Sequence, residues 1–126
     1  MQALVLDDSR AMRLILRRIL GECGFECLEA ADGQEGLDLL AAGHRPDLAL
    51  VDWNMPVLDG LAFVSAVRAQ PELRQMTLMM VTTESEHSQI VRALAAGAHE
   101  YVLKPFTAET ILDKLSLLGL TVAPVA

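Results

Sequence analysis

The strongest constraint on this sequence is a fivefold alternation between short apolar runs and amphipathic segments. Apolar runs of this length, bounded by turn residues, are typical of strands buried on both faces of a sheet. The segment after the first run carries one apolar stripe at helical spacing, formed by Met12, Ile15, Leu16, Ile19 and Leu20. We expect strands at residues 3–6, 26–30, 48–51, 78–81 and 101–103, each followed by a helix.

Capping residues and helix breakers set the expected helix boundaries. Asp32, Asp59 and Thr107 stand where a side-chain oxygen can cap a helix N-terminus. The first helix should end at Gly24 and the second near Gly43, the third should span 60–69, the fourth 85–96, and the last should end at Gly119. Alternating strands and helices predict an α/β protein in which a parallel sheet is covered by helices on both faces.

Size and charge bound the possible functions. The 126 residues predict one domain, which we place at 1–120, followed by a C-terminal tail at 121–126. The net charge is −7, and the arginines of the first helix, at positions 10, 13, 17 and 18, look like its exposed side. Direct binding to nucleic acid is not expected, because it requires a positive face. With two cysteines and no apolar stretch of ~18 residues, a cytoplasmic protein without membrane contact is predicted.

Polar side chains follow four of the five predicted strands. In open parallel sheets the functional crevice lies beyond the carboxyl ends of the strands. The residues at those ends are Asp7-Asp8 after the first strand, Asp52 after the third, Thr82-Thr83 after the fourth and Lys104-Pro105 after the fifth.

Three neighbouring carboxylates repel one another, and a hard divalent cation such as Mg²⁺ would relieve this repulsion. With Mg²⁺ bound, Asp52 could act as a nucleophile toward phosphorus and form an acyl phosphate. Lys104 could then neutralise the transferring phosphoryl group, and Thr82 could donate a hydrogen bond to it. Taken singly, each residue has another explanation. Asp7-Asp8 could cap the first helix, and Lys104 could be a solvated loop lysine. Thr82 could be a strand-end threonine present for its high β-propensity.

The combination resembles the receiver domains of bacterial two-component response regulators. The segments DWNMPVLDG (52–60), MVTTE (80–84) and GAHEYVLKPFTAET (97–110) are similar to those of chemotaxis regulators of the CheY type. The resemblance runs over nearly the whole chain. It implies a flavodoxin-like (βα)5 three-layer sandwich with five parallel strands in the order 2-1-3-4-5.

The resemblance also implies a set of metal ligands and a phosphoacceptor. Asp52 would accept the phosphoryl group. Asp8 would bind Mg²⁺ directly, Asp7 would bind it through water, and the backbone carbonyl of Asn54 would add another ligand.

The remaining roles concern the switch and the phosphoryl group. Thr82 and Tyr101 would be the switch pair, Lys104 would hold a phosphoryl oxygen, and the Lys104-Pro105 bond would be cis. Thr83 stands where the CheY type has a smaller alanine, so it should narrow access to the phosphoryl group. Asn54 and Glu84 should flank the path of hydrolytic water and tune dephosphorylation.

The resemblance predicts a signalling protein rather than an enzyme. The protein is expected to be a monomer that accepts a phosphoryl group from a sensor histidine kinase. Its effector would bind the fourth helix, the fifth strand and the last helix. Glu86 and His87 replace a lysine pair that motor-binding CheY proteins carry, whereas Lys114 matches, so a different effector is expected. Three alternatives stay open: a receiver cut from a larger regulator with a DNA-binding or enzymatic output domain, a phosphate-independent interaction module, and a flavin-binding enzyme, which Asp7-Asp8 disfavours.

Overall fold

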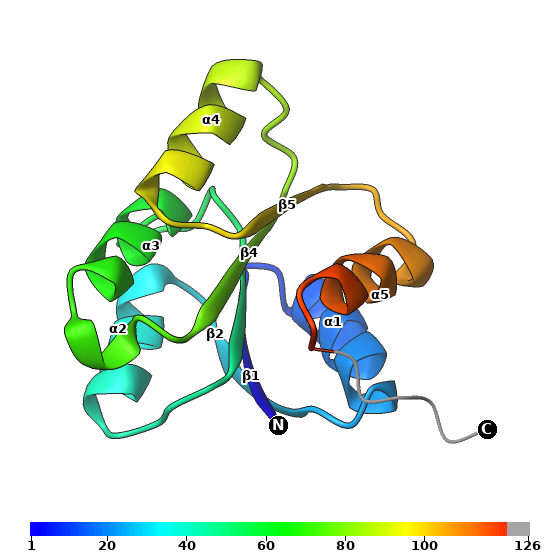
Figure 1. The fold of residues 1–126 in the computed structure, drawn as a ribbon, viewed down its shortest axis with the longest axis horizontal. Coiled ribbons are helices and arrows are strands. Elements are labelled where there is room, and N and C mark those ends of the chain that lie inside the picture. The colour runs from blue at the N-terminus through cyan, green and yellow to red at the C-terminus, as the bar shows by residue number, and fades with distance from the viewer. Residues whose placement is uncertain (121–126) are drawn as a thin grey trace.

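The computed structural model describes residues 1–120, so the predicted tail at 121–126 lies outside the described residues. Strands and helices alternate along the chain as the sequence predicts (Figure 1). The strands are β1 (Gln2–Leu6), β2 (Glu26–Ala30), β3 (Leu48–Val51), β4 (Thr77–Thr82) and β5 (Glu100–Leu103). The helices are α1 (Arg10–Glu22), α2 (Gly33–Ala41), α3 (Gly60–Arg68), α4 (His87–Ala96) and α5 (Ala108–Leu117), with a short 3₁₀ helix, η1 (Pro71–Leu73), before β4.

The five strands form one parallel sheet in the order β2-β1-β3-β4-β5. Helices α1 and α5 cover one face, and α2, α3 and α4 cover the other (Figure 1). The predicted three-layer (βα)5 fold is therefore confirmed. β1, β3 and β4 lie in the middle, which explains why their sequences are continuous apolar runs, and their parallel direction brings all five carboxyl ends to one edge of the sheet.

The core consists of two apolar clusters separated by the sheet. One, beneath α2, α3 and α4, is centred on Phe63, Val64 and Met80. The other, beneath α1 and α5, contains Leu16 and Leu115. The stripe predicted for the first helix is only partly buried: Leu16 and Leu20 are inside, whereas Ile15 at its margin is 48% exposed.

Local capping accounts for most helix starts. The side chains of Asp32, Asp59 and Thr107 each accept a hydrogen bond from a backbone N–H three residues on, as predicted. The cap of α1 is Ser9, which corrects the alternative that Asp7-Asp8 caps this helix. Among the described residues, no helix has the length and apolar character needed to cross a membrane.

The fourth helix begins later than predicted, at His87 instead of residue 85. Its N-cap, Glu86, makes no side-chain capping bond, so no strong local signal marks this start.

Candidate functional site

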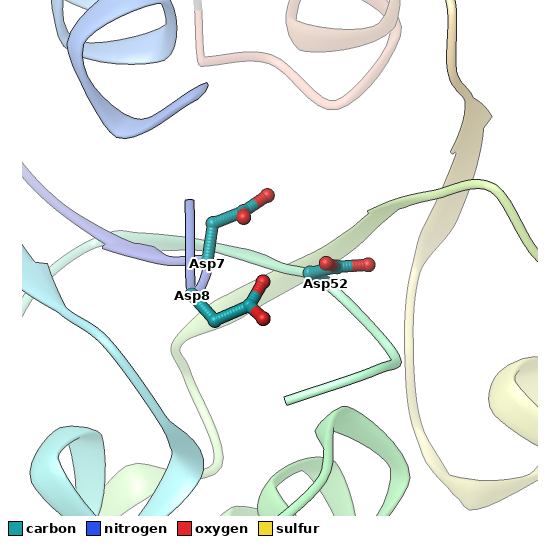
Figure 2. A group of neighbouring side chains, drawn as sticks. All are labelled: Asp7, Asp8 and Asp52. Atoms are coloured by element: carbon teal, nitrogen blue, oxygen red, sulfur yellow. The ribbon is translucent and has the colours of Figure 1, made fainter. Parts of the chain in front are cut away.

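Three aspartates meet at the carboxyl edge of the sheet (Figure 2). Asp7 and Asp8 follow β1, and Asp52 follows β3, the strand next to it. Each offers a carboxylate oxygen, and these atoms all lie within 4.8 Å of one another. Asp7 and Asp52 are buried, at 1% and 6% exposure, whereas Asp8 is exposed. The cluster therefore combines two buried carboxylates with one that is open to solvent.

Lys104 brings the only ammonium group that contacts this cluster among the described residues. Its Nζ lies 2.7 Å from Asp7 Oδ2 and 3.4 Å from Asp52 Oδ2. The Lys104 side chain is mostly buried, and its backbone N–H donates to the carbonyl of Thr82 at 2.9 Å. The Lys104-Pro105 peptide bond is cis. Strand β5 thus delivers one positive charge to carboxylates that come from β1 and β3.

The hydrogen bonds of the aspartates differ in a way that bears on metal binding. Asp7 is fully engaged: Oδ1 accepts from the Ser9 N–H at 2.8 Å, and Oδ2 accepts from Lys104. Oδ1 of Asp52, in contrast, is buried and has no hydrogen-bond partner among residues 1–120. A buried carboxylate oxygen without a donor is costly unless a ligand completes it. This orphaned oxygen and the exposed carboxylate of Asp8 fit a hard divalent cation such as Mg²⁺, which prefers carboxylate oxygen and retained water.

Burial dominates the electrostatics of Asp52. It raises the pKa of this carboxyl, and the nearby Asp7 carboxylate acts in the same direction. The Lys104 ammonium and the Thr82 hydroxyl lower the pKa, but their effect is the smaller one. Additional positive charge beside Asp52 would favour the ionised, nucleophilic form.

Glu84 connects the other predicted site residues. Its side chain accepts from Asn54 Nδ2 at 2.8 Å, and its backbone carbonyl accepts from the Tyr101 hydroxyl at 2.7 Å. Its backbone N–H donates to Thr82 Oγ1 at 3.3 Å. The structure thus links Asn54, Thr82 and Tyr101 through one residue, whereas Thr83 points to solvent as an exposed side chain.

The loop that follows Asp52 is tightly built. A Cβ on Gly60 would come within 2.1 Å of the Asp52 carbonyl oxygen, so only glycine fits there. Val57 in the same loop has a φ of 67° and is 81% exposed. This left-handed conformation is unfavourable for a β-branched residue. The loop that follows Asp52 therefore holds backbone strain.

Two arginines were not predicted at the site. Arg92 of α4 lies over the ring of Trp53, 5.9 Å from its centroid. Arg13, expected on the exposed side of the first helix, has a side chain only 15% exposed and donates to the backbone carbonyl of Asp7 at 2.6 Å. The only sequence signal was its place one turn into the helix that follows Asp7-Asp8, and that spacing alone does not reveal the contact.

Comparisons with known proteins agree on one family. The family model described as "Response regulator receiver domain" matches residues 3–116. A "Chemotaxis protein CheY homolog" of Campylobacter jejuni is 40% identical, with 91% of this chain and 89% of the relative covered. The "Chemotaxis protein CheY" of Pseudomonas aeruginosa is also 40% identical, with 91% and 93% covered.

Solved structures give the same result. The chemotaxis response regulator CheY4 of Vibrio cholerae superposes with a TM-score of 0.85 at 37% identity, covering 93% of this chain and 97% of that one. The receiver domain of a Pseudomonas aeruginosa sensor histidine kinase superposes with a TM-score of 0.82 at 26% identity, covering 92% of this chain and 94% of that one. That structure holds a magnesium ion coordinated in the active site cleft.

Proposed function

This chain belongs to the response regulator receiver domain family, and from that premise we propose that it accepts a phosphoryl group on Asp52. The observation that carries the proposal is the state of Asp52: a buried carboxylate with one unbonded oxygen, beside Lys104 and two further carboxylates. Such a group is poised as a nucleophile once its charge is compensated.

The proposed ligands of Mg²⁺ are Asp8 and Asp52 directly, Asp7 through water and the backbone carbonyl of Asn54. The engagement of both Asp7 oxygens supports the indirect role for this residue. The exposure of Asp8 supports a direct role, since its carboxylate is open to an incoming ion. When bound, Mg²⁺ would supply positive charge that offsets the carboxylates and the phosphoryl oxygens.

The transfer step uses residues on three strand ends. One carboxylate oxygen of Asp52 would face the cation, and the other forms the new O–P bond as the P–N bond of a phosphohistidine breaks. The donor ring, which already carries a proton on its other nitrogen, leaves as neutral imidazole. Lys104 pairs with a phosphoryl oxygen and gives up part of its contact with Asp52. Thr82, buried at the end of β4, donates its hydroxyl to another phosphoryl oxygen. The phosphodonor is a sensor histidine kinase.

The proposed switch runs through Glu84. When Thr82 turns to the phosphoryl group, the 3.3 Å contact from the Glu84 N–H is lost. The loop is then free to release the Tyr101 hydroxyl from the Glu84 carbonyl. Tyr101 lies on β5, so its position alters the surface formed by α4, β5 and α5. This surface is the proposed effector site.

The charge of this surface supports an effector different from that of motor-binding relatives. Glu86 and His87 at the start of α4 are exposed. Lys114, which matches such relatives, is paired with Glu100 at 3.1 Å. A partner that needs several free lysines would therefore find few here.

We propose a single-domain regulator acting as a cytoplasmic monomer in chemotaxis or motility. A second candidate is the receiver portion of a larger regulator, because the same site would serve either protein. The domain limits at 1–120, with a tail at 121–126, stay predictions. The relatives are chemotaxis proteins by name, which favours the first candidate.

The direct test is covalent labelling of Asp52. With Mg²⁺ and acetyl phosphate, the wild-type mass should rise by one phosphoryl group, and Asp52→Asn should show no such rise. Asp47→Asn is the matched control, because it removes an exposed carboxylate near the opposite end of β3. A labile phosphoryl group on Asp52→Asn at the wild-type rate would reject Asp52 as the acceptor.

A further inference from the structure

Arg13 makes a contact that the proposed phosphotransfer chemistry does not use. Its Nη1 donates to the backbone carbonyl of Asp7 at 2.6 Å, and its Nε donates to Glu29 Oε1 at 3.0 Å. The other oxygen of Glu29 accepts from Arg17 at 2.8 Å. One guanidinium thus joins helix α1, the neighbouring strand β2 and the end of β1, where the acidic pair begins.

The carbonyl that Arg13 holds belongs to the peptide unit between Asp7 and Asp8. A peptide unit is planar, so fixing its oxygen also fixes the direction in which the next Cα leaves. The Asp7 N–H is held as well, by the carbonyl of Ala30 at 3.1 Å. Arg13 therefore sets the starting direction of Asp8, whose exposed side chain has no hydrogen-bond partner among residues 1–120 to orient it.

Glu29 in turn fixes Arg13. The Glu29 side chain accepts hydrogen bonds from both Arg13 and Arg17. The Arg13 side chain is 15% exposed, whereas that of Arg17 is 48% exposed. The Arg13 side chain is thus paired with Glu29 and mostly buried, and both features favour a single position of its guanidinium. Arg17 shares the Glu29 anchor but makes no recorded contact with Asp7.

We propose that Arg13 is a positioning residue for the metal site, and that it aligns Asp8 for Mg²⁺ through the Asp7 carbonyl. This inference rests on the proposed function, since it assigns a further residue to the same site. Residues that support metal ligands from behind typically contribute 10- to 100-fold to metal affinity, so we expect a loss of about tenfold for Arg13→Ala.

The charge of Arg13 has an opposite effect that the controls must separate. Removing a cation near the pocket would by itself strengthen Mg²⁺ binding. Arg17→Ala removes the same charge from the same Glu29 without touching Asp7, so it measures this effect. Arg13→Lys keeps the charge but cannot donate to Asp7 and Glu29 in the same forked manner, so it should recover only part of the affinity.

The test is a Mg²⁺ titration of each variant in which the fluorescence of Trp53 reports binding. Trp53 is the single tryptophan and the neighbour of Asp52. Near-UV circular dichroism verifies that each variant is folded. We expect Arg13→Ala to bind Mg²⁺ most weakly, Arg13→Lys to bind it with intermediate affinity, and Arg17→Ala to bind it most tightly of the three. We also expect labelling by acetyl phosphate to recover in Arg13→Ala at saturating Mg²⁺, which a general loss of structure would not allow.

Two results would overturn the inference in different ways. If Arg13→Ala binds Mg²⁺ as tightly as Arg17→Ala, Arg13 has no positioning role, while the proposed function stands. If the wild-type protein shows no Mg²⁺ binding, the proposed function itself fails. Should Arg13→Ala not fold, Arg13→Lys decides the matter, because it keeps the charge and must still bind Mg²⁺ more weakly than the wild type.

Discussion

At the scale of single residues, Asn54 and Glu84 form a hydrogen-bonded bridge beside the proposed phosphoacceptor, Asp52. Asn54 follows Asp52 by two residues, Glu84 follows Thr82 by two, and their side chains meet at 2.8 Å. The bridge spans the loops after β3 and β4, where water would approach a phosphoryl group on Asp52 under the proposed function. Each partner fixes the other, so the loss of either one opens this approach.

We expect Asn54→Ala and Glu84→Ala each to shorten the lifetime of phosphorylated Asp52 by a few-fold, because a smaller side chain admits water more easily. The measurement is the decay of labelled protein after removal of the donor. Ser88→Ala, an exposed change in the first turn of α4, is the control and should leave the decay unchanged. Unchanged decay in both bridge variants would refute a tuning role for this pair.

At the scale of elements, the loop from β3 to α3 combines a required glycine with a strained valine. Gly60 permits close approach to the Asp52 carbonyl, and its N–H donates to the carbonyl of Trp53 at 2.9 Å. Val57, in contrast, holds a φ of 67° with its side chain in solvent, so no packing compensates the strain.

Val57→Asn should stabilise the protein, because asparagine tolerates the left-handed region better than a β-branched residue. Relief of such strain is worth about 1 kcal/mol in the free energy of unfolding. Urea unfolding would measure it. Val91→Asn is the matched control: Val91 is 49% exposed within helix α4, so the same change there should bring no gain. A Val57→Asn protein no more stable than wild type would show that the loop is not strained.

The sequence predicts those elements and residues whose signals are local. Buried apolar runs predict β1, β3 and β4. The capping residues Asp32, Asp59 and Thr107 predict where α2, α3 and α5 begin. The acidic pair and Asp52 are predictable because strand order brings parallel strand ends together. The contact of Arg13 with the Asp7 carbonyl is not predictable, since it depends on the packing of α1 against β2 and not on a repeat in the sequence.

At the scale of the whole molecule, Arg68 and His99 join α3, β4 and β5 at the edge of the sheet opposite the site. Arg68 donates to the Gly97 carbonyl at 2.9 Å and to the Arg74 carbonyl at 3.0 Å. The Nδ1 atom of His99 lies 3.1 Å from Arg68 Nη2 and accepts from the Leu78 N–H at the same distance. With two donors facing Nδ1, the His99 ring must be neutral and carry its proton on Nε2.

This arrangement predicts a pH dependence of stability. Burial, and then the Arg68 charge, lower the pKa of His99 below its usual value. The unfolded chain therefore binds more protons in the window just below about pH 6.5. Stability from this group is complete above that pH and falls as the pH drops toward the lowered pKa of the folded state.

Urea unfolding of the wild type and of His99→Gln across this window tests the prediction. His99→Gln keeps a side-chain acceptor for the Leu78 N–H but cannot titrate, so it should lose less stability on acidification. His87→Gln, in the exposed first turn of α4, should behave as the wild type. Identical slopes of wild type and His99→Gln would remove His99 as the cause.

The division of the core into two apolar compartments has a consequence for signalling. Trp53, the neighbour of Asp52, is anchored in the compartment beneath α2, α3 and α4, whereas Phe106, two residues after Lys104, packs into the one beneath α1 and α5. The ion pair between Lys104 and Asp52 thus joins chain segments that pack into the two apolar compartments on opposite faces of the sheet. Phosphorylation of Asp52, as proposed, would change this ion pair and so act on the packing of both compartments at once.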